Sequence, residues 1–117
     1  MILEFVTFTS PAGWDRTRIV ADAKTTIAKW AANGDLVRKH FLLGIGEAEG
    51  TGAGVYLWPS IEAARKAHDE DWCAAVRTRT GGEPTIRYFD LFLLIDNAQG
   101  VVTEFAADGC PHVLAPA

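Results

Sequence analysis

The spacing of apolar residues along the chain alternates between the period of a strand and that of a helix. Residues 2–9 form a β-branched and aromatic run, which indicates a strand that Ser10 and Pro11 end. From about residue 14 to residue 32 the spacing becomes helical. The apolar face of this helix consists of Ile19, Ala23, Ile27 and Trp30. Asn33 and Gly34 predict its end.

The rest of the chain repeats this order of elements. The predicted segments are a strand at 36–43, a glycine-rich hairpin connection at 44–54, a strand at 55–58, a helix at 61–79 and a long strand at 85–95. Ser60 is a suitable N-cap for the second helix. The acidic residues at 69–71 leave open whether this helix is continuous or broken there.

Strand, helix and strand therefore occur twice in succession. This order predicts an α+β fold of the βαββαβ type, a four-stranded antiparallel sheet with both helices on one face. We expect one domain over residues 1–97. Residues 98–117 are expected to form a C-terminal tail with a short strand at 101–105, and this tail could pack on a partner subunit.

Both sides of the predicted sheet are apolar. One side of the last strand carries Phe89, Leu91, Leu93 and Ile95, and the other carries Tyr88, Phe92 and Leu94. Two helices can cover only one face, so the second face needs an apolar partner. A second copy of the chain is the simplest such partner, and the sequence therefore predicts a homodimer.

Composition narrows the classes of function. The chain has 117 residues, of which 49% are hydrophobic, and a net charge of −4, which disfavours nucleic acid and anionic membranes as partners. No apolar run is long enough to span a membrane, and residues 1–10 do not resemble a signal peptide, so we expect a cytoplasmic protein. Cys73 and Cys110 lack metal-binding or redox spacing and are predicted to be free thiols.

Two segments resemble a known family. They are GVYLWPSIEAARKAHDEDW at 54–72 and GGEPTIRYFDLFLLIDN at 81–97, and both are similar to the dimeric α/β-barrel superfamily, within it the YdhR-like group of small mono-oxygenases. The resemblance covers about residues 1–97 and implies a ferredoxin-like fold. The superfamily includes cofactor-independent oxygenases, haem-degrading enzymes, isomerases and members without an established activity, so fold alone does not fix the reaction.

On the second helix, taken as continuous, His68 and Trp72 are four residues apart and share the face that points toward the sheet. In this position His68 could act as a general base for a planar substrate. The alternative is a core histidine with satisfied hydrogen bonds. A helix break at 69–71 would rotate Trp72 away from His68.

Candidate ligand contacts also lie on the strands. Tyr56 and Trp58 share one face of their strand, while Arg38 and His40 share one face of theirs. Two orientations stay open for His40, which faces either a pocket with His68 or the dimer interface.

Tyr88 and Asp90 lie together on the last strand. An acidic residue in so apolar a segment needs a partner, and Arg87 or Arg38 could provide it.

The resemblance implies a mono-oxygenase that acts on a small phenolic or anthrone-like substrate without flavin, haem or metal. His68 and His40 are the candidate catalytic residues. The candidate substrate-binding residues are Tyr56, Trp58, Trp72, Arg38 and Tyr88.

Two other functions remain alternatives. One is a non-catalytic dimer that binds a small hydrophobic ligand or serves a stress-related role. The other is haem binding and degradation, although the strand-one asparagine of that branch is absent here, where Thr7 and Thr9 stand nearby.

Overall fold

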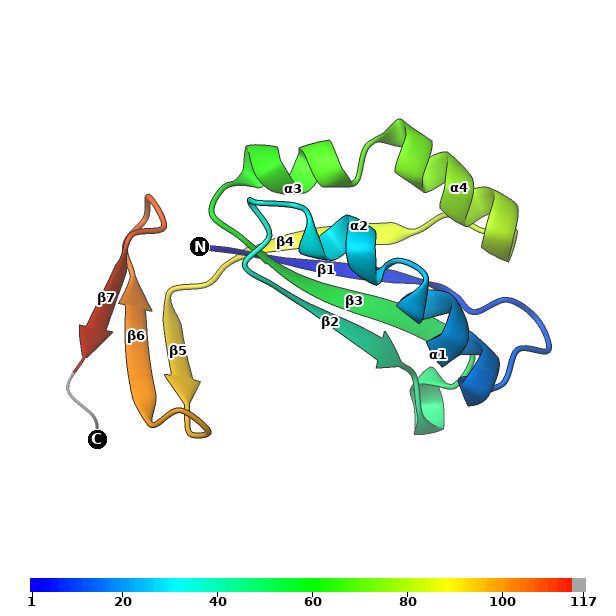
Figure 1. Cartoon of the computed structure of the whole chain (residues 1–117), viewed down its shortest axis with the longest axis horizontal. Helices are drawn as coiled ribbons and strands as arrows, with labels where there is room; N and C mark the ends of the chain where they lie inside the picture. Colours follow the sequence, from blue (N-terminus) through cyan, green and yellow to red (C-terminus); the bar gives the residue numbers. More distant parts are fainter. Residues whose placement is uncertain (115–117) are drawn as a thin grey trace.

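β1 (Ile2–Thr9) and β3 (Thr51–Trp58) form the centre of the main sheet in the computed structural model, which describes residues 1–114 (Figure 1). β2 (Arg38–Leu43) and β4 (Thr85–Asp90) are the outer strands. The strand order is β2-β3-β1-β4, and all neighbours are antiparallel. All helices lie on one face of this sheet. The predicted βαββαβ architecture is therefore confirmed.

The first predicted helix is divided into α1 (Arg16–Lys24) and α2 (Ile27–Ala31). The hydroxyls of Thr25 and Thr26 donate to the carbonyl oxygens of Asp22 and Ala23, at 2.6 and 2.7 Å. Such local bonds compete with a regular helix, which explains the break between the two helices. Because of this break, Ile27 is exposed rather than on the apolar face.

The second predicted helix is also divided, into α3 (Ile61–Ala67) and α4 (Glu70–Thr80). Ser60 caps α3, as predicted, by accepting a hydrogen bond from the backbone amide of Ala63 at 3.2 Å. The Asp69 carboxylate starts α4 by accepting from the amide of Trp72 at 3.0 Å. His68 consequently lies in the junction between two helices. Within residues 1–114, no helix is long and apolar enough to cross a membrane.

β3 begins at Thr51, so the predicted glycine-rich hairpin is shorter than expected and contains only a 3₁₀ turn, η1 (Gly46–Ala48). Gly52 and Gly54 belong to the strand. A methyl group on Gly52 would lie 2.5 Å from the ring of Phe8, and one on Gly54 would lie 2.8 Å from the ring of Tyr56. These glycines let aromatic rings lie against the strand backbone.

The long strand predicted at 85–95 is also divided. The pairing of β4 with β1 ends at Asp90, opposite Ile2, and the backbone amide of Leu91 donates a hydrogen bond to the carbonyl of Met1 at 2.8 Å. The chain continues into a separate antiparallel sheet, in the order β5-β6-β7, beside the N-terminal end of β1 (Figure 1). Its strands are β5 (Leu93–Asp96), β6 (Val101–Phe105) and β7 (Pro111–Leu114).

The strand expected at 101–105 is therefore confirmed as β6. Residues 115–117 of the predicted tail lie outside the described residues. Packing of the tail at 98–117 on a partner subunit stays a prediction.

The core lies between the main sheet and the helices. Its most deeply buried apolar side chains are Val6, Trp58, Ala64 and Val76, and Trp30 is buried as expected. The even-numbered residues of β1 and β3 face this core, whereas their odd-numbered neighbours face away from the helices. On that second face Leu42 and Phe89 remain 44% and 45% exposed. One face of the sheet is thus covered and the other is open.

Replacing Gly52 with alanine should destabilise the fold by about 1–3 kcal/mol, because the new methyl group would displace the Phe8 ring that lies against the strand. Urea unfolding of the variant measures this change. Gly82→Ala is the matched control, since a methyl group there meets no atom within 4 Å and the backbone is not left-handed. Equal effects of the two substitutions would contradict the assigned role of Gly52.

Candidate functional site

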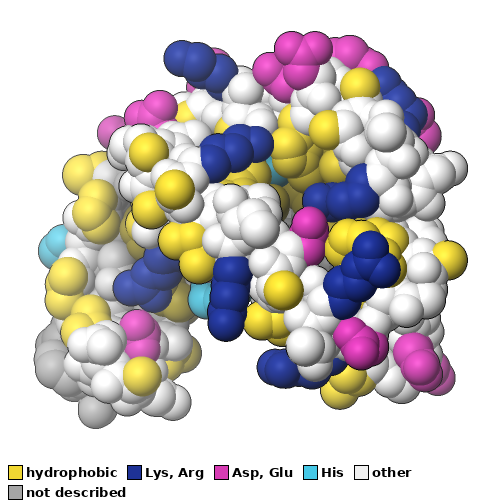
Figure 2. Space-filling model, turned by 45° about the vertical axis from the view of Figure 1, so that its right-hand side comes forward, with side chains coloured by type: hydrophobic (Ala, Val, Ile, Leu, Met, Phe, Trp, Pro, Cys, Tyr) yellow, Lys and Arg dark blue, Asp and Glu magenta, His cyan; other side chains and the backbone are white. Residues whose placement is uncertain are grey.

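A cavity of about 460 Å³ lies between the main sheet and helices α1 and α4. This volume falls within the usual range for small-molecule sites. The apolar part of its lining includes Phe8, Trp14, Ile19, Phe41, Leu43 and Trp72. Figure 2 shows Lys and Arg side chains gathered around apolar surface on one side of the molecule. The cavity therefore suits an apolar ligand that carries negative charge.

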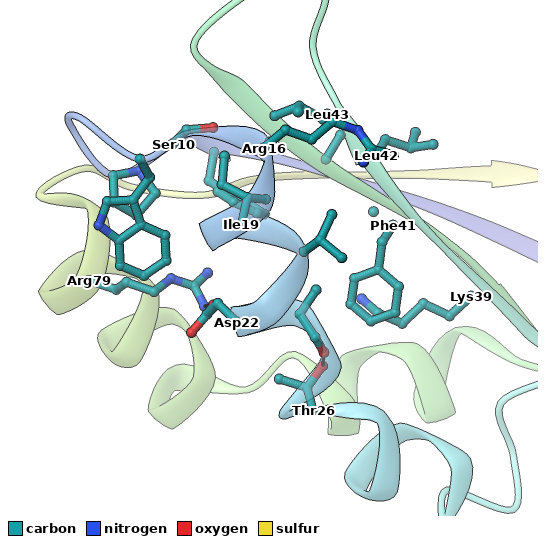
Figure 3. A pocket seen from close by; sticks show the side chains of 18 of the residues that line it. Ser10, Arg16, Ile19, Asp22, Thr26, Lys39, Phe41, Leu42, Leu43 and Arg79 are labelled. Atoms are coloured by element: carbon teal, nitrogen blue, oxygen red, sulfur yellow. Dashed lines mark hydrogen bonds and ion pairs between the residues drawn. The ribbon is translucent and has the colours of Figure 1, made fainter.

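Polar groups enter this cavity from several elements. Arg79 of α4 reaches toward Asp22 of α1, with 3.7 Å between the guanidinium and the carboxylate (Figure 3). Arg16 of α1 and Lys39 of β2 also line it, and Lys39 lies beside Phe41. Three of these four side chains are basic and one is acidic.

Lys39 is held among aromatic rings. Its register partner on β3 is Tyr56, which places its side chain on the helix-facing side of the sheet. The ammonium nitrogen donates a hydrogen bond to the Tyr56 hydroxyl. The same nitrogen is 3.9, 4.1 and 4.6 Å from the ring centroids of Tyr56, Phe41 and Trp30. No carboxylate of residues 1–114 forms an ion pair with it.

This environment changes how Lys39 and Tyr56 ionise. Burial lowers the pKa of Lys39 to about 7, with a further contribution from the nearby charge of Lys29, while Glu4 acts in the opposite direction. Burial, together with the charge of Glu4, raises the pKa of Tyr56. Near neutral pH the amine can therefore lose a proton, while the phenol keeps its own.

His68 lies behind the cavity wall and not at its surface. Its ring contacts Trp72 edge-on with 4.4 Å between centroids, contacts Tyr56 edge-on at 4.5 Å and stacks on Trp30 at 5.5 Å. The side chain has no exposed surface. The helix break at His68 and Asp69 thus does not separate His68 from Trp72, because α4 restarts at once and turns Trp72 back toward the histidine.

Glu4 is the buried partner of His68. Its Oε1 lies 2.8 Å from Nδ1 of His68 and accepts a hydrogen bond from Nε1 of Trp58 at 3.0 Å. The approach of Nδ1 does not have hydrogen-bond geometry, and neither His68 nitrogen nor Oε2 of Glu4 makes a hydrogen bond with residues 1–114. The Glu4–His68 contact therefore leaves buried polar atoms without a hydrogen-bond partner among residues 1–114, which is uncommon for buried polar groups.

The structure brings most of the predicted site residues to the helix-facing side of the sheet. Tyr56 and Trp72 line the cavity, while His68 and Trp58 support it from behind. Tyr88 lies opposite Glu4 in the strand register. Burial raises the pKa of Tyr88, and the nearby charge of Glu4 raises it further.

Arg38 and His40 lie on the other face of the sheet. They are opposite Leu57 and Val55 in the strand register, so neither side chain lies on the helix-facing side of the sheet with His68. Of the two orientations left open for His40, the one that faces away from the helices is observed. Arg38 lies 3.8 Å from Asp96 of β5, so its acidic partner is Asp96 and not Asp90.

Sequence reasoning missed Lys39 and Glu4. Lys39 stands between Arg38 and His40, so strand alternation alone places it on the opposite face from both. Glu4 was visible as a single carboxylate in an apolar strand. What the sequence lacked was the strand register, which puts both residues near Tyr56.

Cys73 and Cys110 are free, as predicted. In the part of the chain that the structure describes, no group of three or more His, Cys, Asp or Glu side chains is placed to hold a metal ion.

No family model and no curated protein matches the sequence. Solved structures do match the fold. An antibiotic biosynthesis mono-oxygenase aligns over 78% of this chain and 98% of its own, with a TM-score of 0.57 and 9% identity. A variant of SnoaB, a cofactor-independent oxygenase from Streptomyces nogalater, aligns over 77% of this chain and 92% of its own, with a TM-score of 0.54 and 17% identity.

The chain has the ferredoxin-like fold of the antibiotic biosynthesis mono-oxygenases. A protein of unknown function from Nitrosomonas europaea shares it, with a TM-score of 0.56 and 17% identity over 77% of this chain and 87% of its own. The ferredoxin-like fold that the sequence resemblance implied is thus confirmed. Because fold does not determine chemistry, the activity has to be argued from the cavity.

Replacing Lys39 with methionine should change how stability depends on pH. Between about pH 7 and pH 10.5 the unfolded chain binds the Lys39 proton more firmly than the folded chain does. The stability of the wild type therefore rises with pH in this window relative to the variant. Urea unfolding at several pH values should show the largest advantage of Lys39→Met at or below pH 7. A constant difference, as expected for the exposed control Lys24→Met, would contradict the buried amine.

The Glu4–His68 contact should appear as coupling in a double-mutant cycle. Glu4→Gln and His68→Gln each remove one partner of a fully buried pair, and each should cost about 3–5 kcal/mol. The double variant should cost at least about 1 kcal/mol less than the sum of the two. The exposed pair Arg77 and Glu83 is the control and should be close to additive. Additivity at Glu4 and His68 would argue against the contact.

Proposed function

We propose that this protein is a cofactor-independent mono-oxygenase that acts as a homodimer on a small phenolic or anthrone-like substrate. A cytoplasmic location goes with this proposal. The supporting observation is the contact between Lys39 and Tyr56 in a cavity of about 460 Å³ with aromatic walls. A planar aromatic ring can pack among such side chains, and its acidic group can reach the Lys39 amine.

The first step of the proposed reaction removes a proton from the substrate. The neutral amine of Lys39 accepts this proton, since its pKa of about 7 matches the task of a base near neutral pH. The ammonium group formed then lies next to the negative charge of the substrate. Arg79 adds a second positive charge at the cavity wall, although Asp22 balances part of it.

Oxygen then reacts with the substrate anion. The electron-rich anion transfers one electron to O₂, and the two radicals combine into a peroxide on the substrate carbon. The Lys39 ammonium group returns its proton to this peroxide anion. Loss of water, which takes the outer oxygen of the peroxide and the hydrogen on the same carbon, then leaves a carbonyl group. One oxygen atom thus ends in the product and the other in water. The substrate supplies the electrons, so the protein has to provide a base, a positive environment and an apolar enclosure.

His68 has a positioning role in this proposal. Its ring touches both Tyr56 and Trp72, which line the cavity, but its own side chain is fully enclosed. In this proposal Lys39 takes the place of His68 as the base, because Lys39 lines the cavity and His68 does not. Glu4 and Trp58 hold His68 in place from behind.

The open face of the sheet is the proposed dimer interface. Its apolar side chains come from all four strands of the main sheet and are Leu3, Phe5, Leu42, Val55 and Phe89. Leu57 faces the same side but is already buried in the single chain. A second copy would cover this face with an identical surface. In the dimer Arg38 and His40 would lie at the interface, because both face away from the helices.

Binding without catalysis is the second candidate function. The same cavity supports it, because enclosure and charge complementarity are sufficient for a small hydrophobic ligand. The two functions differ in oxygen consumption, which only the enzyme shows.

Oxygen uptake with a panel of hydroquinones and anthrones tests the enzymatic proposal. Wild type should consume oxygen, and Lys39→Met should lose roughly 100-fold or more of the rate through loss of the base. Lys24→Ala is the control, because Lys24 lies on an exposed part of α1 outside the cavity. Binding of these compounds without oxygen uptake would favour the second function.

Sedimentation of the purified protein tests the dimer. Wild type should sediment as a dimer, and Phe89→Asp should shift it to the monomer by placing a charge on the open face. Ile27→Asp is the control, since Ile27 is equally apolar and 55% exposed but lies on the helix side. A monomeric wild type would refute the proposed assembly.

A further inference from the structure

We propose that Lys39 condenses with the carbonyl group of a small aldehyde or ketone in the cavity and forms a reversible imine. This activity goes beyond the proposed oxygenation. It requires the cavity and the amine but neither oxygen nor a phenolic substrate.

Position distinguishes Lys39 from the other lysines of the chain. Its side chain is half-buried and lines the cavity, whereas Lys24, Lys29 and Lys66 are exposed. Three aromatic rings lie within 4.6 Å of its nitrogen, and no carboxylate pairs with it in residues 1–114. An amine in such an apolar environment loses its proton readily, and the neutral amine is a nucleophile.

Most of the charges around Lys39 also favour its neutral amine over the ammonium form. Lys29 of α2 and Arg79 of α4 are cations, and both disfavour the ammonium form. Glu4 of β1 favours that form, but it lies against His68. Arg16 and Asp22 of α1 also line the cavity, where Asp22 faces Arg79.

Tyr56 supplies the proton transfers that imine formation needs. The amine nitrogen adds to the carbonyl carbon, and a proton moves from nitrogen to oxygen to give a carbinolamine. The Tyr56 hydroxyl, which is hydrogen-bonded to Nζ, then donates a proton to the departing hydroxyl group. The remaining proton on nitrogen returns to Tyr56. The net change is amine plus carbonyl to imine plus water, without any oxidation or reduction.

The cavity has room for the carbonyl partner. Its volume of about 460 Å³ fits a molecule with one or two rings, and its walls are mainly aromatic and aliphatic. Small aromatic aldehydes and ketones are therefore the class of compound that this site would capture.

Reductive trapping with benzaldehyde and cyanoborohydride tests the inference. Mass spectrometry of the intact wild type should show one benzyl group, and peptide mapping should place it on Lys39. Labelling of Lys39 should be half-maximal near pH 7 and roughly tenfold faster than that of Lys24, Lys29 or Lys66. Lys39→Arg should lose the fast phase, Tyr56→Phe should slow it, and Lys24→Arg should leave it unchanged.

The same labelling experiment on wild type in concentrated urea uses no variant, so its result does not depend on how well the variants fold. Lys39 should lose its advantage there, because unfolding exposes all four lysines alike. Equal labelling of Lys39 and the exposed lysines in the folded protein would overturn the inference, as would a fast phase that persists in Lys39→Arg. Oxygen uptake is measured separately, so failure of the oxygenase proposal is distinguishable from failure of this one.

Discussion

The site depends on one interaction, the burial of the Lys39 amine against the Tyr56 hydroxyl without a carboxylate to balance it. Removing an amine from water disfavours its charge, which gives the group a pKa of about 7 instead of 10.5. The fold maintains this costly arrangement because the register of β2 on β3 holds Lys39 opposite Tyr56. A buried group with a strongly altered pKa in a cavity is typical of a functional site.

The rest of the helix-facing side supports that contact. Gly54 leaves room for the Tyr56 ring, while His68 in the helix junction packs against the same ring from behind. The Glu4–His68 contact leaves polar atoms without hydrogen bonds, so its presence is better explained by positioning than by stability. The open face of the sheet is independent of this system, which separates the proposed assembly from the proposed chemistry.

Local patterns predicted most of the fold. The period-two run of β1 and the N-cap Ser60 were identified correctly, since both depend on neighbouring residues. The helix breaks and the division of the last strand were harder to foresee, because they result from specific hydrogen bonds such as that between Leu91 and Met1. Trp72 and Tyr56, which the sequence suggested as ligand contacts, line the cavity. Lys39 was missed, because which strand face meets the helices depends on tertiary register.

The most direct test of the central claim is the ionisation of a coloured phenol in the cavity. We would bind 4-nitrophenol at a pH where the free compound is protonated and record its absorbance. The bound phenol should give the spectrum of the phenolate, because its proton passes to Lys39 or its anion pairs with the ammonium group. The Lys39→Met variant should bind the phenol without this change. A bound phenol that stays neutral in the wild type would show that Lys39 neither accepts the proton of a ligand nor stabilises its anion.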